Sequence, residues 1–557
     1  TRRLLRLAAI TAAALAMPIL LSVPPAYGDA GKKISKGLER RLQEVAPDDQ
    51  VRVIVQTLLA PSSIHYGRLH RRGGAVRRLH TSIQGYAATL PAAQISAFAE
   101  DPEIERVSLD APVSAHLDVA RMSVNAGSNF VTDSGFTGRG VGVAIIDTGV
   151  SGHADLVRTK SGARLYEVEI VGSEAGVADY YGHGTHVAGI LAGSGKLSSD
   201  RHSFRTFAGV APGADIISLR ALYPDGSGFT SDVIAAIDWV VAHKNDYNIR
   251  VLTLALGHPI FESYRTDPLC RAVRAATDAG ILTVVAAGNE GAIGSGFGTI
   301  TSPGNEPTAI TVGAMDDDGT AAITDDVLAW YSSRGPSLID HIVKPDIVAP
   351  GTWIVSTRAY GSYLDTEYHS LTLLRDEYKD EPGKAVKDGD YFVLSGTSMA
   401  TPMVAGAAAL MLEKEPDLGP GDLKARLMAS ARKDDYLIFE TGAGYLDVEA
   451  ALQASGHATF TPSPYAFVQA DGSVTIEDTG LIWNIEWTQG LIWGFRPGST
   501  ATWSITDLEN DQITASGVIW GGGGSRRTKS TSTVDLLDTF WQVDGESSGA
   551  DFCTQCR

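Results

Sequence analysis

The sequence predicts an α/β fold, with a doubly wound and mainly parallel sheet, for the central part of this 557-residue chain. One observation is a series of short apolar runs, rich in β-branched residues and without polar alternation, as expected for strands covered on both faces. Another is that helical segments, such as residues 231–244 and 270–279, separate these runs. The predicted strands are residues 141–146, 216–219, 251–256, 281–287 and 310–314. Active sites in such sheets lie beyond the carboxyl ends of the strands, so chemistry is expected in the residues that follow each run.

A small α+β unit is predicted ahead of this sheet. Its pattern is strand, basic loop or helix, strand, strand, helix, strand, which is a βαββαβ order. The predicted strands are residues 51–57, 75–82, 85–90 and 104–109, the helix is 91–101, and the basic segment is 61–73.

A Trp/Gly-rich, β-type tail is predicted after residue 456, where helical periodicity stops. A unit of glycine, two apolar residues and tryptophan recurs imperfectly at residues 480–483, 490–493 and 517–520. Apolar and aromatic strands separated by glycines indicate stacked β turns or a small sheet. A degenerate, partly disordered tail is the alternative.

The N-terminus predicts a secretory signal over residues 1–28. Arg2, Arg3 and Arg6 precede an apolar run over residues 7–23, and small residues stand at the two positions that a signal peptidase reads, up to Gly28. A short buried helix is the alternative. No later stretch is apolar for long enough to cross a bilayer, so we expect a secreted protein without a membrane span.

The charge distribution argues against a nucleic-acid partner. Residues 1–117 carry 15 Lys and Arg against 10 Asp and Glu, whereas the remaining residues carry 31 against 55. Such an acidic body repels nucleic-acid phosphates. The basic N-terminal part is suited to dock on the acidic body, although a merely solvated loop would also explain the basic residues 68–78.

Three residues beside predicted strands or helices carry groups suited to catalysis. Asp147 follows the strand at 141–146, where a turn-forming Asp is the alternative. His183 begins a helix of small residues three positions before His186, and a zinc site made by these two histidines is the alternative, although no Cys or acidic partner flanks them. Ser398 precedes an apolar helix, where an ordinary N-cap is the alternative.

Asn289 supplies the fourth group, since it directly follows a buried strand; a left-handed turn residue is its alternative. A hydroxyl is a poor nucleophile near neutral pH, so it needs a base. The base in turn needs a carboxylate to fix its tautomer, and the developing oxyanion needs hydrogen-bond donors. The chain supplies one candidate for each role, in the order Asp147, His183, Asn289, Ser398.

The segments around these residues resemble the three catalytic motifs of the subtilisin-like serine peptidases. Residues 143–149 read VAIIDTG, residues 183–189 read HGTHVAG, and residues 396–402 read GTSMATP. The resemblance covers about residues 119–455. The unit at 51–117 resembles the family's inhibitory propeptide, which acts as a folding assistant and is cut off by the enzyme itself.

The resemblance implies a secreted serine endopeptidase that is made as a zymogen and forms an acyl-enzyme intermediate. Ser398 is then the nucleophile, His183 the general base and Asp147 the group that orients it. The Asn289 side chain and the Ser398 backbone N–H are implied to hold the oxyanion. Protein or peptide substrates are implied to lie extended beside Gly226, Ser227, Gly228, Ala255, Leu256 and Gly257. The pocket for the side chain next to the cut bond is implied to be bordered by Ala286, Ala287 and Gly288.

The implied domains are a signal at 1–28, an inhibitory propeptide at 29–118, the peptidase at 119–455 and the C-terminal extension at 456–557. Self-processing is expected between about Asp110 and Ala120. The sequence departs from the family's pattern at Ala255, where many relatives have Ser. It also has an insertion at about residues 358–390, which is expected to rim the substrate cleft because it lies so close in sequence to Ser398.

The resemblance implies that catalysis needs no cofactor. Structural calcium is common in the family, but no oxygen-ligand set can be located in this sequence. Cys270 is expected to be a buried small residue rather than a nucleophile. Cys553 and Cys556 fit either a small disulfide loop or half of a metal site.

Two other functions stay open on the sequence. One is an exopeptidase or a dedicated processing protease of narrow specificity. The other, from a different class, is a noncatalytic surface-binding protein that keeps the fold and attaches through its Trp repeats.

Overall fold

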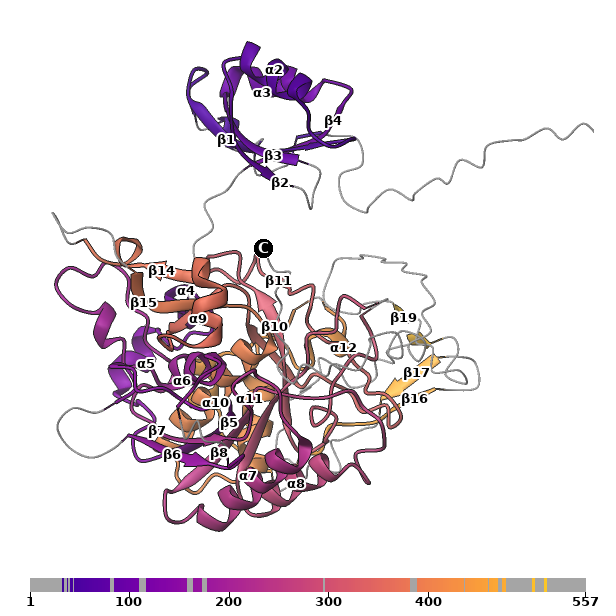
Figure 1. Ribbon diagram of the computed structural model, residues 1–557. Coiled ribbons are helices and arrows are strands. Elements are labelled where there is room, and N and C mark those ends of the chain that lie inside the picture. The colour runs from indigo at the N-terminus through magenta and orange to yellow at the C-terminus, as the bar shows by residue number, and fades with distance from the viewer. Residues whose placement is uncertain are drawn as a thin grey trace, which may run out of the picture. The chain divides into compact units, whose positions relative to one another are not determined.

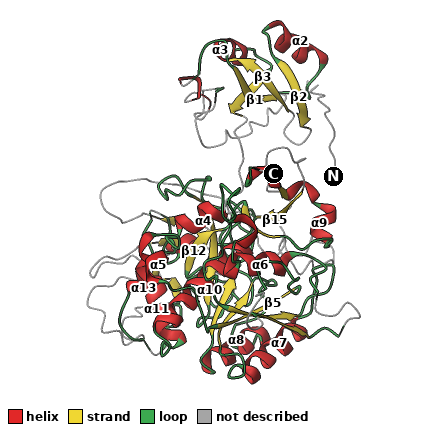
Figure 2. Cartoon of the chain, turned by 90° about the vertical axis from the view of Figure 1, so that its left-hand side faces the viewer, coloured by secondary structure: helices red, strands yellow, loops and turns green. Residues whose placement is uncertain are grey.

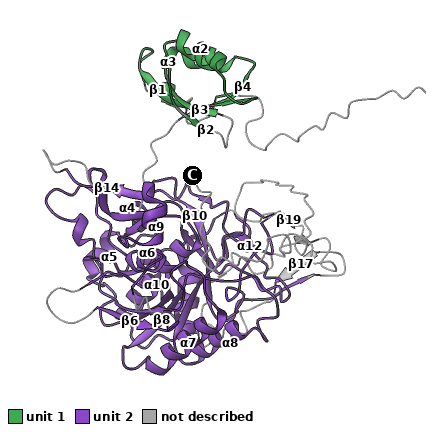
Figure 3. Ribbon diagram, viewed as in Figure 1, with its two compact units in different colours: residues 1–113 green, residues 114–557 purple. Residues whose placement is uncertain are grey.

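A computed structural model describes residues 33–34, 38, 41–43, 45–80, 85–109, 117–157, 164–172, 178–293, 296–380, 388–434, 436–458, 460–468, 473–476, 503–505 and 515–517. The chain divides into two compact units, residues 1–113 and residues 114–557 (Figure 3). The predicted signal at 1–28 lies outside the described residues, as do Asp110, the motifs at 480–483 and 490–493, Cys553 and Cys556. Among the described residues, no helix is both long enough and apolar enough to cross a bilayer.

The first unit has the predicted βαββαβ order. Its elements are β1 (Gln50–Thr57), α2 (Ser63–Arg71), β2 (Ala75–His80), β3 (Gly85–Pro91), α3 (Ala92–Ala99) and β4 (Ile104–Leu109). The strands form an antiparallel sheet in the order β2-β3-β1-β4. Val51, Val53 and Val55 are buried on one face of β1 and pack in a core with Phe98 of α3. The sequence predicted either a loop or a helix over residues 61–73, and the structure has the helix α2 within this segment.

The sheet of the second unit is the predicted parallel one. Its strands are β5 (Gly142–Asp147), β6 (Leu165–Glu169), β7 (Asp215–Arg220), β8 (Ile249–Leu254), β9 (Leu282–Ala286), β10 (Ile310–Asp316), β11 (Val327–Leu328) and β12 (Ile347–Pro350). Their order is β11-β10-β9-β8-β5-β7-β6, with β12 also paired to β10. All of these pairs are parallel except β10 with β11. The strand order reverses beside β5, where doubly wound sheets form their ligand crevice.

Helices cover both faces of this sheet, as Figures 1 and 2 show. The helices are α4 (Leu117–Ser123), α5 (Asn129–Ser134), α6 (His183–Ala192), α7 (Thr230–His243), α8 (Pro268–Asp278), α10 (Thr397–Lys414), α11 (Pro420–Ser430), α12 (Ile438–Thr441) and α13 (Val448–Gln453). Val143 and Ile145 of β5 pack into the core that α6 and α10 share. Ala144 and Ile146 face the core built with α7 and α8. Burial on both faces explains why the strands read as continuous apolar runs.

The insertion at about 358–390 lies within a three-stranded antiparallel sheet that leads into α10. Its elements are β13 (Ile354–Thr357), α9 (Tyr363–Glu367), β14 (Thr372–Leu374) and β15 (Asp388–Leu394), paired in the order β13-β15-β14. In the part of the chain that the structure describes, short 3-10 helices lie at Lys196–Ser198, His369–Leu371 and Arg375–Glu377.

The described part of the tail is of β type. Four strands, β16 (Ala466–Val468), β17 (Ser473–Ile476), β18 (Trp503–Ile505) and β19 (Ala515–Gly517), pair in sequence order. The segment that leads into β16 is bound to the main sheet unit, because the Val343 N–H donates to the Pro464 carbonyl at 2.8 Å and the Ala466 N–H donates to that of His341 at 2.8 Å. The packed structure therefore continues past residue 455.

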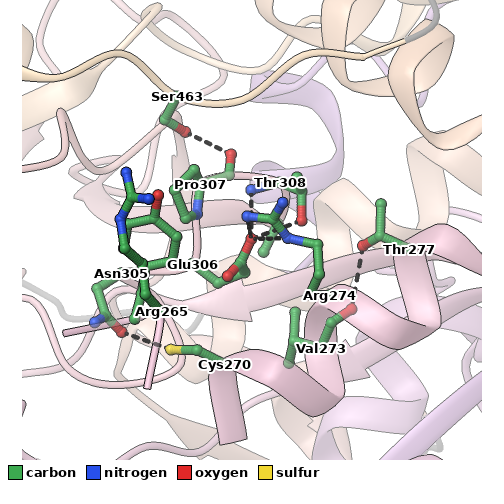
Figure 4. A network of polar contacts seen from close by, with 12 residues as sticks. Arg265, Cys270, Val273, Arg274, Thr277, Asn305, Glu306, Pro307, Thr308 and Ser463 are labelled. Carbon is green, nitrogen blue, oxygen red and sulfur yellow. Dashed lines mark hydrogen bonds and ion pairs between the residues drawn. The ribbon is translucent and has the colours of Figure 1, made fainter. Parts of the chain in front are cut away.

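Two buried lysines lie beneath this segment. Lys344 pairs with Asp346 at 2.7 Å, and Lys424 donates to the Pro307 carbonyl at 2.7 Å and to the Ser463 hydroxyl at 2.8 Å. Burial, opposed by the charge of Asp346, lowers the pKa of Lys424 to about 7. Figure 4 shows Ser463, which also donates to the Pro307 carbonyl at 3.1 Å.

Candidate active site

Asp147 and His183 form a hydrogen-bonded pair at the carboxyl end of β5. Asp147 is the last residue of β5 and His183 the first of α6, and both side chains are buried. The imidazole Nδ1 lies 2.8 Å from Oδ1 and 3.0 Å from Oδ2 of the carboxylate. Because a carboxylate only accepts, Nδ1 carries the proton, and the lone pair of the neutral ring is on Nε2. The pair thus presents a basic nitrogen in a fixed tautomer.

The start of α6 approaches β5 closely because residue 184 is glycine. A Cβ at Gly184 would lie 2.2 Å from the Gly149 carbonyl oxygen and 3.1 Å from the Cβ of Asp147. No other residue fits that space without moving backbone.

A second carboxylate, Asp179, holds this helix start in place. It is buried and accepts from the backbone N–H groups of Gly182 at 2.6 Å and Thr185 at 2.8 Å. It also accepts from the hydroxyls of Thr148 at 2.8 Å and Thr185 at 2.6 Å. Burial raises the pKa of Asp179, while these hydrogen bonds act in the opposite direction. Asp179 therefore links the residue after Asp147 to both sides of His183.

The Ser398 hydroxyl contacts the residue that follows the neighbouring strand, β8. Ser398 is the second residue of α10, and its hydroxyl donates to the Ala255 carbonyl at 3.0 Å. Ile146 of β5 pairs with Leu254 of β8, so Asp147 and Ala255 leave the sheet at the same level. Adjacent strands are about 4.8 Å apart. The imidazole held by Asp147 and the hydroxyl held at Ala255 are therefore anchored to neighbouring strand ends.

Asn289 contacts the turn that carries Ser398. Its side-chain Oδ1 accepts from the Thr397 backbone N–H at 2.9 Å and from the Thr397 hydroxyl at 3.1 Å. These bonds fix the amide so that Nδ2 is its donor end, and a Cβ on Gly396 would lie 3.3 Å from that nitrogen. An amide donor is thus placed beside the start of α10.

The predicted substrate segments follow the ends of β7, β8 and β9. Residues 226–228 follow β7, residues 255–257 follow β8, and residues 286–288 lie at the end of β9. The prediction that Ala255 and Leu256 belong to a strand is wrong, because β8 ends at Leu254. Both residues therefore lie beyond the end of β8, and the Ala255 carbonyl accepts from the Ser398 hydroxyl.

His186 does not form a metal site with His183. Its Nε2 donates to the backbone carbonyls of Ile354 at 3.1 Å and Phe392 at 3.0 Å. Burial lowers the pKa of His186 to about 3, so this ring is neutral and structural. Within the described ranges, no group of three or more His, Cys, Asp or Glu side chains is placed to hold a metal ion.

Cys270 is buried, as the sequence predicts, and its Sγ contacts the Asn305 Oδ1 at 3.2 Å (Figure 4). Burial and the charge of Asp267 raise the pKa of this thiol. A thiol held neutral is a poor nucleophile.

The sequence reasoning missed Asp179. Its position four residues before His183 could have marked it as a candidate near the site. Its hydrogen bonds to Thr148 and Thr185, however, form only in the folded structure.

Comparison with known proteins identifies the class to which this fold and site belong. The sequence model of the Subtilase family matches residues 138–445. Serine protease AprX of Bacillus subtilis (strain 168) is 37% identical over 374 residues, which cover 66% of this chain and 78% of that protein. Subtilisin E of the same organism is 31% identical over 389 residues, covering 69% of this chain and 85% of that protein. A crystal structure of a cold adapted subtilisin-like serine proteinase aligns with 29% identity and a TM-score of 0.41, over 56% of this chain and 90% of that one.

The chain belongs to the subtilase family, because the family match spans more than half of it. It is a serine peptidase that acts on protein substrates, and subtilases need no cofactor for catalysis.

Proposed function

We propose that this chain is a secreted serine endopeptidase, made as a zymogen, with Ser398 as nucleophile, His183 as general base and Asp147 as the group that orients the base. The supporting observation is the Asp147–His183 hydrogen bond at the end of β5, beside the Ser398–Ala255 contact at the end of β8. The serine hydroxyl needs a base to take its proton, and the base needs a carboxylate to fix its tautomer, so the three roles depend on one another.

In the proposed reaction, the Ser398 Oγ attacks the carbonyl carbon of the scissile peptide, and its proton moves to Nε2 of His183. The Asn289 Nδ2 and the Ser398 backbone N–H hold the oxyanion that forms. His183 then gives the proton to the departing amine, which leaves an ester on Ser398. A water molecule then gives a proton to His183 while its oxygen attacks the ester carbon. The bond to the Ser398 oxygen breaks, the acid leaves, and His183 returns the proton to that oxygen, which restores the serine hydroxyl.

Substrate is proposed to lie extended beside Gly226, Ser227 and Gly228 on one side and Ala255, Leu256 and Gly257 on the other. The backbone N–H and C=O groups in these segments can pair with an added strand. Ala286, Ala287 and Gly288 would then border the pocket for the side chain next to the cut bond, where small residues leave room.

Residues 29–118 are proposed to be an inhibitory propeptide, after a signal at 1–28 and before a peptidase domain at 119–455 and the extension at 456–557. The compact α+β unit at 1–113 and its likeness to the family's propeptide support this assignment. A Ser398→Ala variant should then accumulate uncut between about Asp110 and Ala120. Normal trimming of that variant would show that another protease removes the unit.

The endopeptidase assignment is tested by digestion of a denatured protein mixture with the matured enzyme. Many internal cuts are expected. Removal of terminal residues only, or cleavage at one motif only, would instead support an exopeptidase or a dedicated processing protease.

A further inference from the structure

The turn before α8 is bound to the C-terminal extension. This turn, residues 263–267, lies between the predicted substrate segment 255–257 and α8. The hydroxyl oxygens of Tyr264 and Tyr465 are 2.5 Å apart, and the Arg265 guanidinium donates to the Tyr465 oxygen at 2.7 Å. The two tyrosines also share a small apolar cluster. A residue of the extension therefore holds the turn by both polar and apolar contacts.

A carboxylate supports the same turn from a second segment. Asp340 accepts from the Ser263 hydroxyl at 2.6 Å and from the Tyr264 N–H at 2.8 Å. Its neighbours Ile339 and His341 have φ angles of 66° and 52°, in the left-handed region that disfavours side chains other than glycine, above all β-branched ones. Strained backbone persists where the surrounding structure holds it, and it is concentrated at functional sites. Here the strain lies on both sides of the residue that binds the turn.

The extension also fixes the strained segment that carries Asp340. The Ala466 N–H donates to the His341 carbonyl at 2.8 Å, and Ile342 and Tyr465 form an antiparallel bridge. The extension thus supports the turn before α8 in two ways, directly through Tyr465 and indirectly through the backbone that presents Asp340.

The turn ends in Asp267, whose carboxylate binds Ser302. Asp267 is buried, and its Oδ2 accepts from the Ser302 hydroxyl at 2.7 Å, while its Oδ1 accepts from the Leu269 N–H at 2.8 Å at the start of α8. The Asp267 N–H donates to the Ser263 carbonyl at 2.8 Å, which ties this residue to the part of the turn that Asp340 holds. The position of Ser302 therefore depends on the shape of the turn.

Ser302 and Thr301 lie between the two predicted substrate segments. The Ser302 N–H donates to the carbonyl of His258 at 2.8 Å, and the His258 N–H donates back at 2.9 Å, directly after the segment at the end of β8. The Thr301 N–H donates to the carbonyl of Ala287 at 3.1 Å, in the segment at the end of β9. One short stretch of chain thus bonds to the backbone on both sides of the predicted pocket.

Close packing transmits any shift of this stretch to both segments. A Cβ added to Gly257 would lie 2.6 Å from the Thr301 Oγ1, and one added to Gly288 would lie 2.8 Å from the Thr301 Cγ2. Atoms packed so tightly move together, because protein interiors leave little free space. The position of residues 301–302 therefore sets the separation of the two segments.

We propose that the C-terminal extension takes part in substrate binding by fixing the separation of the segments 255–257 and 286–288. Tyr465 and Asp340 are the positioning residues, since they hold the turn before α8, which in turn holds Ser302. This inference rests on the proposed function, because it needs substrate to lie beside these two segments. It gives the extension an effect on the affinity for substrate.

The test compares an extended peptide amide with the ester of a single amino acid, using matured enzyme that keeps the extension. The extended peptide pairs with the backbone of these segments, whereas the ester reaches little beyond Ser398. Tyr465→Phe keeps the ring but removes the oxygen that contacts the turn. It should raise KM for the peptide about two- to fivefold while kcat, and hydrolysis of the ester, change little.

Ser302→Ala, which removes the hydroxyl that Asp267 binds, should raise the same KM by a similar factor. Because both changes interrupt one path, KM in the double variant should rise by less than the product of the two separate factors. Tyr436→Phe is the matched control, since it also removes a buried-side hydroxyl contact, the one that accepts from the Leu328 N–H of β11 at 3.0 Å, and it should leave KM unchanged.

An unchanged KM for the peptide in Tyr465→Phe and Ser302→Ala, from enzymes that take a fluorophosphonate label as fast as the wild type, would overturn the inference and leave the proposed function standing. Equal losses on the peptide and the ester, or a double variant whose KM rises by the full product, would overturn it as well. If the wild type takes no label and cuts no peptide, the proposed function itself fails, and the inference fails with it.

Discussion

Replacing Asp179 with Ala should destabilise the protein and slow catalysis together. The variant removes the acceptor for two buried N–H groups, those of Gly182 and Thr185. Each unsatisfied buried donor costs about 1–3 kcal/mol, so the expected loss is about 4 kcal/mol. The hydroxyls of Thr148 and Thr185 add less, because Thr148 also donates to Asp147 and a hydroxyl can turn.

Catalysis should fall because His183 begins the helix that Asp179 holds. A displacement of about 1 Å in a reacting group costs about 100-fold in rate, so kcat should drop by about that factor while KM changes little. Asp179→Asn keeps one acceptor oxygen and should lose about half as much stability. Asp246→Ala, at an exposed site, is the matched control and should change stability by less than about 0.5 kcal/mol.

Unfolding in urea is best measured in a Ser398→Ala background, so that self-digestion does not distort the transition, and kcat is measured in the active background. A loss below 1 kcal/mol for Asp179→Ala would refute the account of the hydrogen bonds. A destabilised variant with unchanged kcat would refute the claim that Asp179 positions His183.

Three further predictions follow from buried groups. The pKa of His186 is about 3 in the folded protein and about 6.5 in the unfolded chain, so the unfolded state binds more protons between these values. The free energy of unfolding should therefore fall by about 2 kcal/mol from pH 6.5 to 4.5. An equal dependence of this free energy on pH in the wild type and in His186→Gln would contradict this. Arg358→Met leaves the Asp365 carboxylate buried without its cation and should lower the free energy of unfolding in urea by about 3–5 kcal/mol. The double variant Arg358→Met/Asp365→Leu should recover part of that free energy. An unchanged free energy of unfolding in Arg358→Met would mean that the pair is solvated. A chain ending at residue 468 should have a free energy of unfolding at least about 2 kcal/mol greater than one ending at 455, because only the longer one keeps the Ser463 contacts with Lys424 and Pro307. Equal free energies of unfolding in urea would show that this segment adds nothing.

The sequence was sufficient for elements whose pattern is local. The β-branched runs predicted β5, β7, β8, β9 and β10 because burial on both faces removes polar residues from the strands themselves. The helix that starts at His183 and the helix that carries Ser398 near its start were likewise visible in runs of small and apolar residues.

Groups buried by distant partners could not be predicted in this way. Lys344 and Lys424 are fully buried around Asp346, although lysine alone predicts an exposed position. β6 was also missed, because Leu165–Glu169 is a half-buried edge strand in which acidic residues alternate with apolar ones. Such features depend on which segments the fold brings together.

The most direct test of the central claim is the site and rate of reaction with a fluorophosphonate, followed by peptide mapping of the matured enzyme. A single adduct on Ser398 is expected, and His183→Ala should slow its formation by at least about 1,000-fold because His183 is the group proposed to take the hydroxyl proton. An adduct on another residue, or equally fast labelling of Ser398 in His183→Ala, would contradict the assignment of Asp147, His183 and Ser398 to one catalytic unit.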